Sequence, residues 1–175
     1  MSTYIRHELL VVDSGVEGWQ QLYQDVNGRA RVHVLKPGED AIDVISRALD
    51  GTRYDALHLV GHGVPGAITL AGQSIDLDVI SARSAEVTGW ADALAGSDLL
   101  IYGCETGAGD EGQAFVEEIE KLTGARVAAA SKQVGAGNWD LDVHAGVIDP
   151  AVIFSSSLQS AYASTFANVT FSIAP

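Results

Sequence analysis

The stretch Asp98-Leu-Leu-Ile-Tyr-Gly-Cys-Glu-Thr-Gly-Ala-Gly109 contains Cys104, the only cysteine of the chain. An apolar run at residues 99–102 is closed by Gly103, a pattern typical of a buried strand that ends in a tight turn. Open α/β sheets place their sites beyond the carboxyl ends of strands. We therefore expect Cys104 to lie at such a site.

A second stretch has the same design. Residues 55–66 read Asp-Ala-Leu-His-Leu-Val-Gly-His-Gly-Val-Pro-Gly, so a buried apolar run again ends in glycine and delivers His62. Two strands that each present a reactive side chain at the same kind of end predict a cysteine–histidine pair.

The rest of the chain alternates between strand and helix patterns, which predicts a mostly parallel sheet flanked by helices. Right-handed crossovers allow a 2-1-3-4 strand order, in which the strands before His62 and Cys104 are neighbours. A β-hairpin is expected at residues 66–77, with its turn at Ala71-Gly72. The expected strands are 8–13, 31–35, 56–61, 98–103, 126–130 and 139–143, and the expected helices are 16–26, 40–49 and 112–123.

Domain organisation follows from length and composition. The 175 residues, 47% hydrophobic and 19% charged, fit one globular domain, which we place at residues 1–150. Residues 151–175 form a Ser/Ala-rich tail with an alternating pattern at 169–173. That tail is expected to be an edge strand, a linker or disordered.

Charge and cysteine content exclude several classes of function. A net charge of −13 with ten Lys and Arg argues against nucleic acid and anionic membrane surfaces as partners. No apolar run approaches the length of a membrane span, and the N-terminus lacks a Sec signal pattern. A single cysteine excludes an internal disulfide and a CxxC metal site, so no metal and no cofactor are expected.

The pair has the parts that acyl transfer requires. A thiol near its free pKa is mostly protonated at neutral pH, so a nucleophilic Cys104 needs a base, which His62 can supply. The backbone N–H groups of Gly63 and Cys104 are the candidate oxyanion donors.

Each residue also has a simpler interpretation. Cys104 alone is compatible with a small buried apolar side chain, and His62 with a loop residue at a strand end. His58 is expected to be packed in the core, and Asp13 is expected to cap the turn at Gly15.

A His-Gly pair after one strand and a Gly-Cys pair after a later strand resemble the caspase-like (clan CD) cysteine peptidases. The separation of 104 − 62 = 42 residues is near the roughly 50 typical of caspases, although the chain has Tyr-Gly-Cys-Glu-Thr where caspases have Gln-Ala-Cys-Arg-Gly. Residues 101–107 and 123–131 are similar to CHAT-type peptidases. They are closer still to the DUF4347 family, which often lies near the N-terminus of large bacterial surface and adhesin-like proteins. This resemblance runs from about Leu9 to Val147.

The resemblance implies a caspase-like three-layer α/β sandwich with a His62/Cys104 dyad. It places Ser131, Lys132 and Gln133, which follow the fifth strand, in the substrate pocket. Trp139 either walls this pocket or fills the core.

The implied function is a cysteine peptidase that cleaves peptide or protein substrates, its own parent chain included. The implied location is secreted or at the cell surface, as part of a larger bacterial protein. The alternative is a catalytically silent binding or adhesion-associated module with the same fold. A nucleotide-binding domain is disfavoured, because the first strand is followed by neither GxGxxG nor a P-loop.

Overall fold

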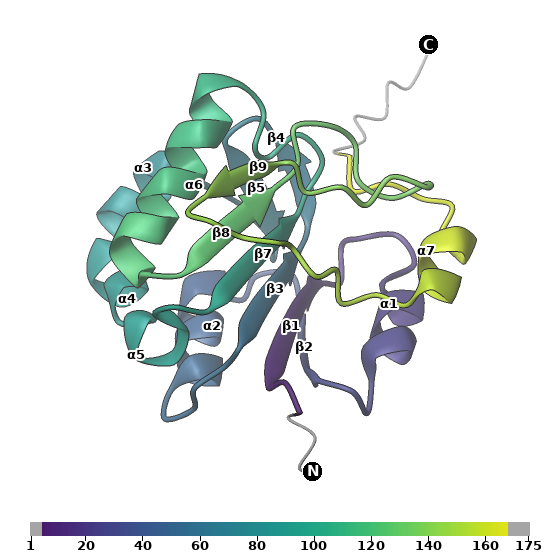
Figure 1. The fold of residues 1–175 in the computed structure, drawn as a ribbon, viewed down its shortest axis with the longest axis horizontal. Helices are drawn as coiled ribbons and strands as arrows, with labels where there is room; N and C mark the ends of the chain where they lie inside the picture. The colour runs from purple at the N-terminus through teal and green to yellow at the C-terminus, as the bar shows by residue number, and fades with distance from the viewer. Residues whose placement is uncertain (1–4, 168–175) are drawn as a thin grey trace.

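A computed structural model describes residues 5–167 (Figure 1). Its strands are β1 (Glu8–Asp13), β2 (Arg31–Leu35), β3 (Ala56–Val60), β4 (His62–Val64), β5 (Ala67–Leu70), β6 (Gln73–Asp76), β7 (Asp98–Tyr102), β8 (Arg126–Ala129) and β9 (Val143–Ala145). Its helices are α1 (Trp19–Val26), α2 (Ala41–Leu49), α3 (Leu77–Ala82), α4 (Ser84–Thr88), α5 (Ala91–Leu94), α6 (Gly109–Thr123) and α7 (Ser156–Ala161).

The main sheet has six strands in the order β2-β1-β3-β7-β8-β9. Its first five strands are parallel, and β9 pairs antiparallel with β8. Strands β3 and β7 are neighbours, with Val60 opposite Tyr102 at their carboxyl ends. The prediction that the strands before His62 and Cys104 lie side by side is confirmed. The expected strand at 139–143 forms later, at Val143–Ala145.

Helices cover both faces of this sheet. Helices α2 to α6 lie on one face, and α1 and α7 lie on the other (Figure 1). The alternation of side chains along β1 matches the two layers. Leu9 and Val11 belong to the core shared with α2 to α6, whereas Leu10 and Val12 belong to the core shared with α1 and α7. The predicted mostly parallel α/β architecture is confirmed at this level.

A second, smaller sheet carries the histidine. Strands β4, β5 and β6 are antiparallel and consecutive, so the hairpin expected at 66–77 is confirmed. Its turn has positive φ angles at Ala71 (55°) and Gly72 (83°), the backbone that a tight two-residue hairpin turn requires. Strand β4, missed by the sequence pattern, begins at His62, with only Gly61 between it and the end of β3.

Helix boundaries follow local chemistry. Asp40 accepts a hydrogen bond from the Asp43 N–H at 3.0 Å and caps α2, as expected. Helix α6 ends at Gly124, whose φ of 70° forms the left-handed cap. Helix α1 begins at Trp19, later than expected, because Gly18 before it has a left-handed φ of 74°.

Residues 151–167 are part of the main body of the protein. Their apolar side chains pack in the same core as α1, and α7 is tied to α1 because the Ser155 N–H donates to Asp25 at 2.9 Å. The expected division at residue 150 therefore has no counterpart in the packing. The alternating segment 169–173 lies outside the described residues. The core residues within 151–167 are Ile153, Phe154, Leu158, Tyr162 and Phe166.

His58 is a core residue, as its strand position predicted. Its side chain is fully buried, its Nδ1 lies 2.8 Å from the Tyr102 hydroxyl, and its Nε2 lies 3.0 Å from Glu8 Oε1. The Tyr102 oxygen also accepts the Ile153 N–H at 3.1 Å, so the hydroxyl hydrogen is free to point at His58. His58 is thus held as a neutral ring, and burial lowers its pKa although Glu8 opposes this.

We predict that the free energy of unfolding decreases as pH falls below 6.5, the ordinary pKa of histidine. Below that pH the unfolded chain binds a proton that folded His58 does not, so the slope is up to about 1.4 kcal/mol per pH unit. Urea unfolding at several pH values measures it. His58→Gln, which keeps one donor and one acceptor, should flatten the slope, and substitution of the exposed His7 should not. Equal slopes in both variants would contradict the assignment.

Candidate active site

Cys104 lies just past β7 and is 2% exposed. Its Sγ accepts a hydrogen bond from the Val134 N–H at 3.1 Å and lies 3.5 Å from the Val134 carbonyl oxygen. Burial raises the pKa of the thiol, while the N–H groups of Val134 and Phe166 lower it and the charge of Glu105 raises it further. The net rise keeps Cys104 a neutral thiol at rest.

His62 is the first residue of β4, and among the described residues its ring is hydrogen-bonded on one side only. Nε2 lies 3.1 Å from the carbonyl oxygen of Gly15. A carbonyl oxygen only accepts, so Nε2 carries a hydrogen, and in the neutral ring the lone pair is on Nδ1. Within residues 5–167, Nδ1 is buried and has no hydrogen-bond partner. The ring therefore presents an unprotonated nitrogen that is free to take a proton.

The Gly15 carbonyl is held by the turn after β1. Asp13 Oδ1 accepts the Gly15 N–H at 3.1 Å, and the Ser14 N–H donates to the Leu35 carbonyl oxygen at 2.9 Å. Asp13 therefore caps this turn, as expected. Gly15 itself was missed as a site residue, because its contribution is a backbone oxygen that any residue would offer. The Asp-Ser-Gly turn at the end of a strand is the signal that could have indicated it.

The backbone of β4 lies directly against the backbone that precedes and contains Cys104. A Cβ atom placed on Gly63 would lie 2.6 Å from the carbonyl carbon of Gly103 and closer still to the Cys104 carbonyl oxygen. Both Gly63 and Gly103 would also place a Cβ 2.5 Å from Thr106 Oγ1. The two glycines thus allow His62 and Cys104 to be carried on touching segments.

Thr106 fastens these segments together. Its fully buried hydroxyl donates to the Ala67 carbonyl oxygen at 3.0 Å, and its own carbonyl oxygen accepts the Gly66 N–H at 3.0 Å. The hairpin that carries His62 is therefore bonded to the loop that carries Cys104. No sequence pattern indicated this role for Thr106.

The segment after α7 returns to the carboxyl-end edge of the sheet (Figure 1), where it is bridged to strand β4 on one side and to the loop after β8 on the other. The Gly63 N–H, a predicted oxyanion donor, donates to the Phe166 carbonyl oxygen at 2.9 Å. The Phe166 N–H donates to the Val134 carbonyl oxygen at 3.1 Å. Thr165 forms an antiparallel bridge with Gly135. An extended piece of the same chain thus lies between strand β4 and the loop after β8.

The three residues predicted for the pocket have different surroundings. Ser131 donates through its N–H to Asp142 at 2.8 Å, which fixes the loop after β8. Lys132 is exposed, and its carbonyl oxygen accepts the Glu105 N–H at 2.9 Å. The Gln133 side chain donates to Thr165 Oγ1 at 3.2 Å. Among these three residues and within the described contacts, only Gln133 bonds through its side chain to the segment after α7, at Thr165.

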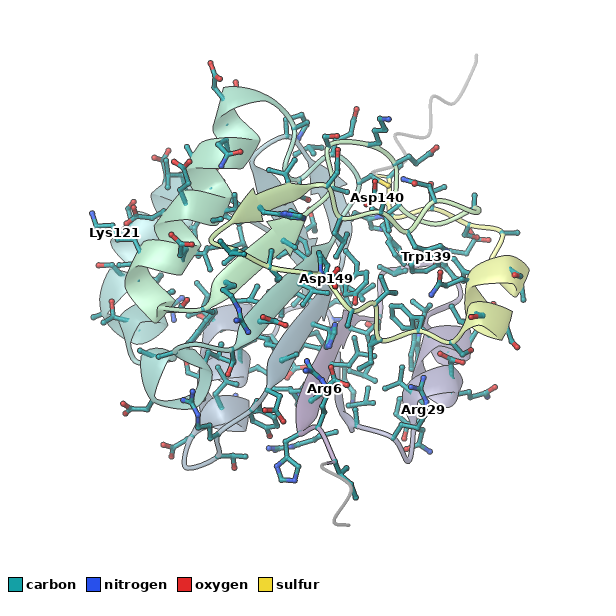
Figure 2. All side chains as sticks on the ribbon, in the orientation of Figure 1. Arg6, Arg29, Lys121, Trp139, Asp140 and Asp149 are labelled. Atoms are coloured by element: carbon teal, nitrogen blue, oxygen red, sulfur yellow. The ribbon has the colours of Figure 1, made fainter. Side chains whose placement is uncertain are left out.

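Trp139 belongs both to the core and to the wall around Phe166. Figure 2 shows it on the side of the sheet covered by α1 and α7. Its ring centroid lies 5.8 Å from that of Phe166 and 5.9 Å from that of Tyr162, with both pairs edge to face, and 5.4 Å from that of Phe154. The interpretation of Trp139 as a core residue is therefore confirmed, and its place in the substrate pocket stays a prediction. Val134, Tyr162 and Phe166 were not identified from the sequence.

The fold and the site define the class: a mixed α/β domain that places His62 and Cys104 beyond the carboxyl ends of adjacent parallel strands. The chain belongs to the family described as domain of unknown function DUF4347, whose model matches residues 9–166. The match extends to Phe166, past Val147, so the segment after β9 belongs to the family domain. The curated proteins compared with the chain give no match.

Two further observations concern metal binding and membrane spans in the described part of the chain. Across residues 5–167, no three His, Cys, Asp or Glu side chains group closely enough to hold a metal ion. In that same range, none of the helices combines the length and apolar character needed to cross a membrane.

We predict that Gly63→Ala lowers the free energy of unfolding by about 3 kcal/mol, because the new methyl group meets backbone atoms that cannot rotate away. Urea unfolding measures it. Gly15→Ala is the matched control: that Cβ would meet only ordinary contacts with the Asp13 carboxylate, at 3.5 Å, so the change should be within about 0.5 kcal/mol. Similar losses in the two variants would contradict the close backbone contact.

Proposed function

We propose that the chain is a cysteine peptidase of caspase-like type, with Cys104 as nucleophile and His62 as general base. The observation that carries the proposal is the unpartnered Nδ1 of His62, whose lone pair is left free because the Gly15 carbonyl holds the hydrogen on Nε2. A histidine with only a structural role would be expected to satisfy both ring nitrogens when buried, as His58 does.

The electrostatics favour general-base catalysis over a preformed ion pair. Because burial raises the pKa of Cys104, the thiol keeps its proton until a substrate carbonyl is in place. Nδ1 of His62 then takes the proton as Sγ attacks the carbonyl carbon, and returns it to the departing amine. The thiol is neutral at rest, so no buried thiolate has to be maintained between reactions.

One of the two proposed oxyanion donors already donates a hydrogen bond to a peptide carbonyl oxygen. The Gly63 N–H is bonded to a carbonyl oxygen at 2.9 Å, and the Cys104 N–H is the second proposed donor. The residue that precedes the scissile bond is bound as an extended strand against Val134 and Gly135, the position now taken by Thr165 and Phe166. The substrate is therefore an extended peptide or protein segment, the parent chain included.

Three expectations from the family resemblance remain part of this proposal. The layers correspond to the caspase-like sandwich, and Gln133 and Trp139 contribute to the substrate pocket. The domain works in a secreted or cell-surface protein. A catalytically silent binding module is the competing function, and it has no use for a free imidazole lone pair.

We predict that a phenylalanyl acyloxymethyl ketone labels Cys104, and that His62→Ala slows this labelling at pH 7 by at least about 100-fold. Intact-mass spectrometry measures the rate, and peptide mapping identifies the labelled residue. His7→Ala, which removes an exposed histidine, should leave the rate unchanged. Cys104→Ala should abolish labelling.

The competing function predicts a different result. Labelling of the wild type at the rate of a free thiol, with no effect of His62→Ala, would mean that the histidine activates nothing. The peptidase proposal would then be abandoned and the binding module retained.

A further inference from the structure

We infer that the bond between Phe166 and Ala167 is itself a substrate of this site, and that the chain cleaves itself there. The inference rests on the proposed function, because it uses the same nucleophile, base and oxyanion donor. It adds the identity of the substrate segment and of the scissile bond.

The backbone of the segment is bound on both sides of that bond. On the amino side, Thr165 pairs with Gly135, and the Phe166 N–H donates to the Val134 carbonyl oxygen at 3.1 Å. On the other side, Ala167 forms a parallel bridge with Gly63. The segment is thus extended and clamped between the loop after β8 and strand β4, which is how a peptide added to a strand edge is bound.

The carbonyl of Phe166 is the one placed for reaction. Its oxygen accepts the Gly63 N–H at 2.9 Å, so the donor that would stabilise an oxyanion already polarises this particular carbonyl. The Cys104 sulfur accepts the Val134 N–H at 3.1 Å, and the Val134 carbonyl oxygen accepts the Phe166 N–H at 3.1 Å. Val134 therefore links the nucleophile to the residue whose carbonyl oxygen is bonded to the oxyanion donor.

The side chain of Phe166 fills the adjacent pocket. It is fully buried, with its ring centroid 5.8 Å from Trp139 and 5.5 Å from Tyr162. Gln133 donates to Thr165 Oγ1 at 3.2 Å on the outer side. The pocket is apolar and aromatic, so it selects a large aromatic side chain before the scissile bond.

The reaction balances with water as the only added reactant. Sγ of Cys104 bonds to the carbonyl carbon of Phe166, its proton passes to His62 Nδ1, and the oxygen carries the charge at the Gly63 N–H. The C–N bond then breaks, and the Ala167 nitrogen leaves with the proton from His62, giving a thioester. Water adds to the thioester carbon while His62 takes its proton, and the proton returns to the departing thiolate. The products are a Phe166 carboxylate and an Ala167 amine.

The test is incubation of the 175-residue chain at neutral pH, followed by intact-mass spectrometry and sequencing of the released peptide. The expected result is loss of residues 167–175, with Ala167 as the new N-terminus. Cys104→Ala and His62→Ala should remain at full length.

Three variants test the assigned bond. Phe166→Gly empties the pocket, so it should slow self-cleavage by at least about tenfold and speed labelling by the ketone probe. Ala167→Pro keeps the Phe166 ring and converts the scissile amide to a tertiary one, so it should block cleavage in a folded chain. Phe171→Gly is the matched control at a second phenylalanine of the tail and should be cleaved like the wild type.

The outcomes separate this inference from the proposed function. A wild-type chain that stays intact, or is cut at another bond, while its labelling depends on His62, overturns the inference and leaves the peptidase. A chain that shows neither cleavage nor His62-dependent labelling overturns both.

Discussion

The site depends on one contact between two backbones. Gly63 lies so close to Gly103 and Cys104 that no side chain fits between them, and Thr106 bonds the two segments together. Parallel pairing of β3 with β7 brings the strand ends to the same edge, and the absence of a Cβ atom lets the segments touch. The positions of His62 and of the Gly63 N–H relative to the thiol are therefore set by main-chain packing, which is stiffer than side-chain packing.

His58 and His62, four residues apart, differ in how many of their ring nitrogens are hydrogen-bonded. His58 has a donor on one side and an acceptor on the other, so both of its ring nitrogens are used and the ring is inert. His62 has an acceptor alone, which fixes the hydrogen on Nε2 and leaves a lone pair buried. Because an unsatisfied buried polar atom is unfavourable, its presence is more informative than the mere occurrence of a histidine after a strand.

The sequence was sufficient to place His62 and Cys104 after the ends of neighbouring strands, because apolar runs closed by glycine locate strand ends. The sequence was not sufficient to identify Gly15, Val134 and Phe166 as residues of the candidate site. Gly15 and Val134 act through carbonyl and N–H groups that every residue possesses, so composition carries no trace of them. Phe166 acts through a return of the chain across the sheet, and its Ser/Ala-rich surroundings show no periodicity that would predict packing. The helices and the hairpin, by contrast, are encoded by caps and turns within a few residues.

The anchoring of α7 has a consequence for stoichiometry. The residues up to Phe166 are held in the core by aromatic packing and by the Ser155–Asp25 contact, independently of whatever follows Ala167. After the proposed cut, the new carboxylate would stay bound at the Gly63 N–H, with its ring still in the pocket. Each molecule would then act once on itself and be inhibited by its own product. Cleavage of a second substrate would wait until the segment after α7 leaves the site, so release of that segment would set the rate of further turnover.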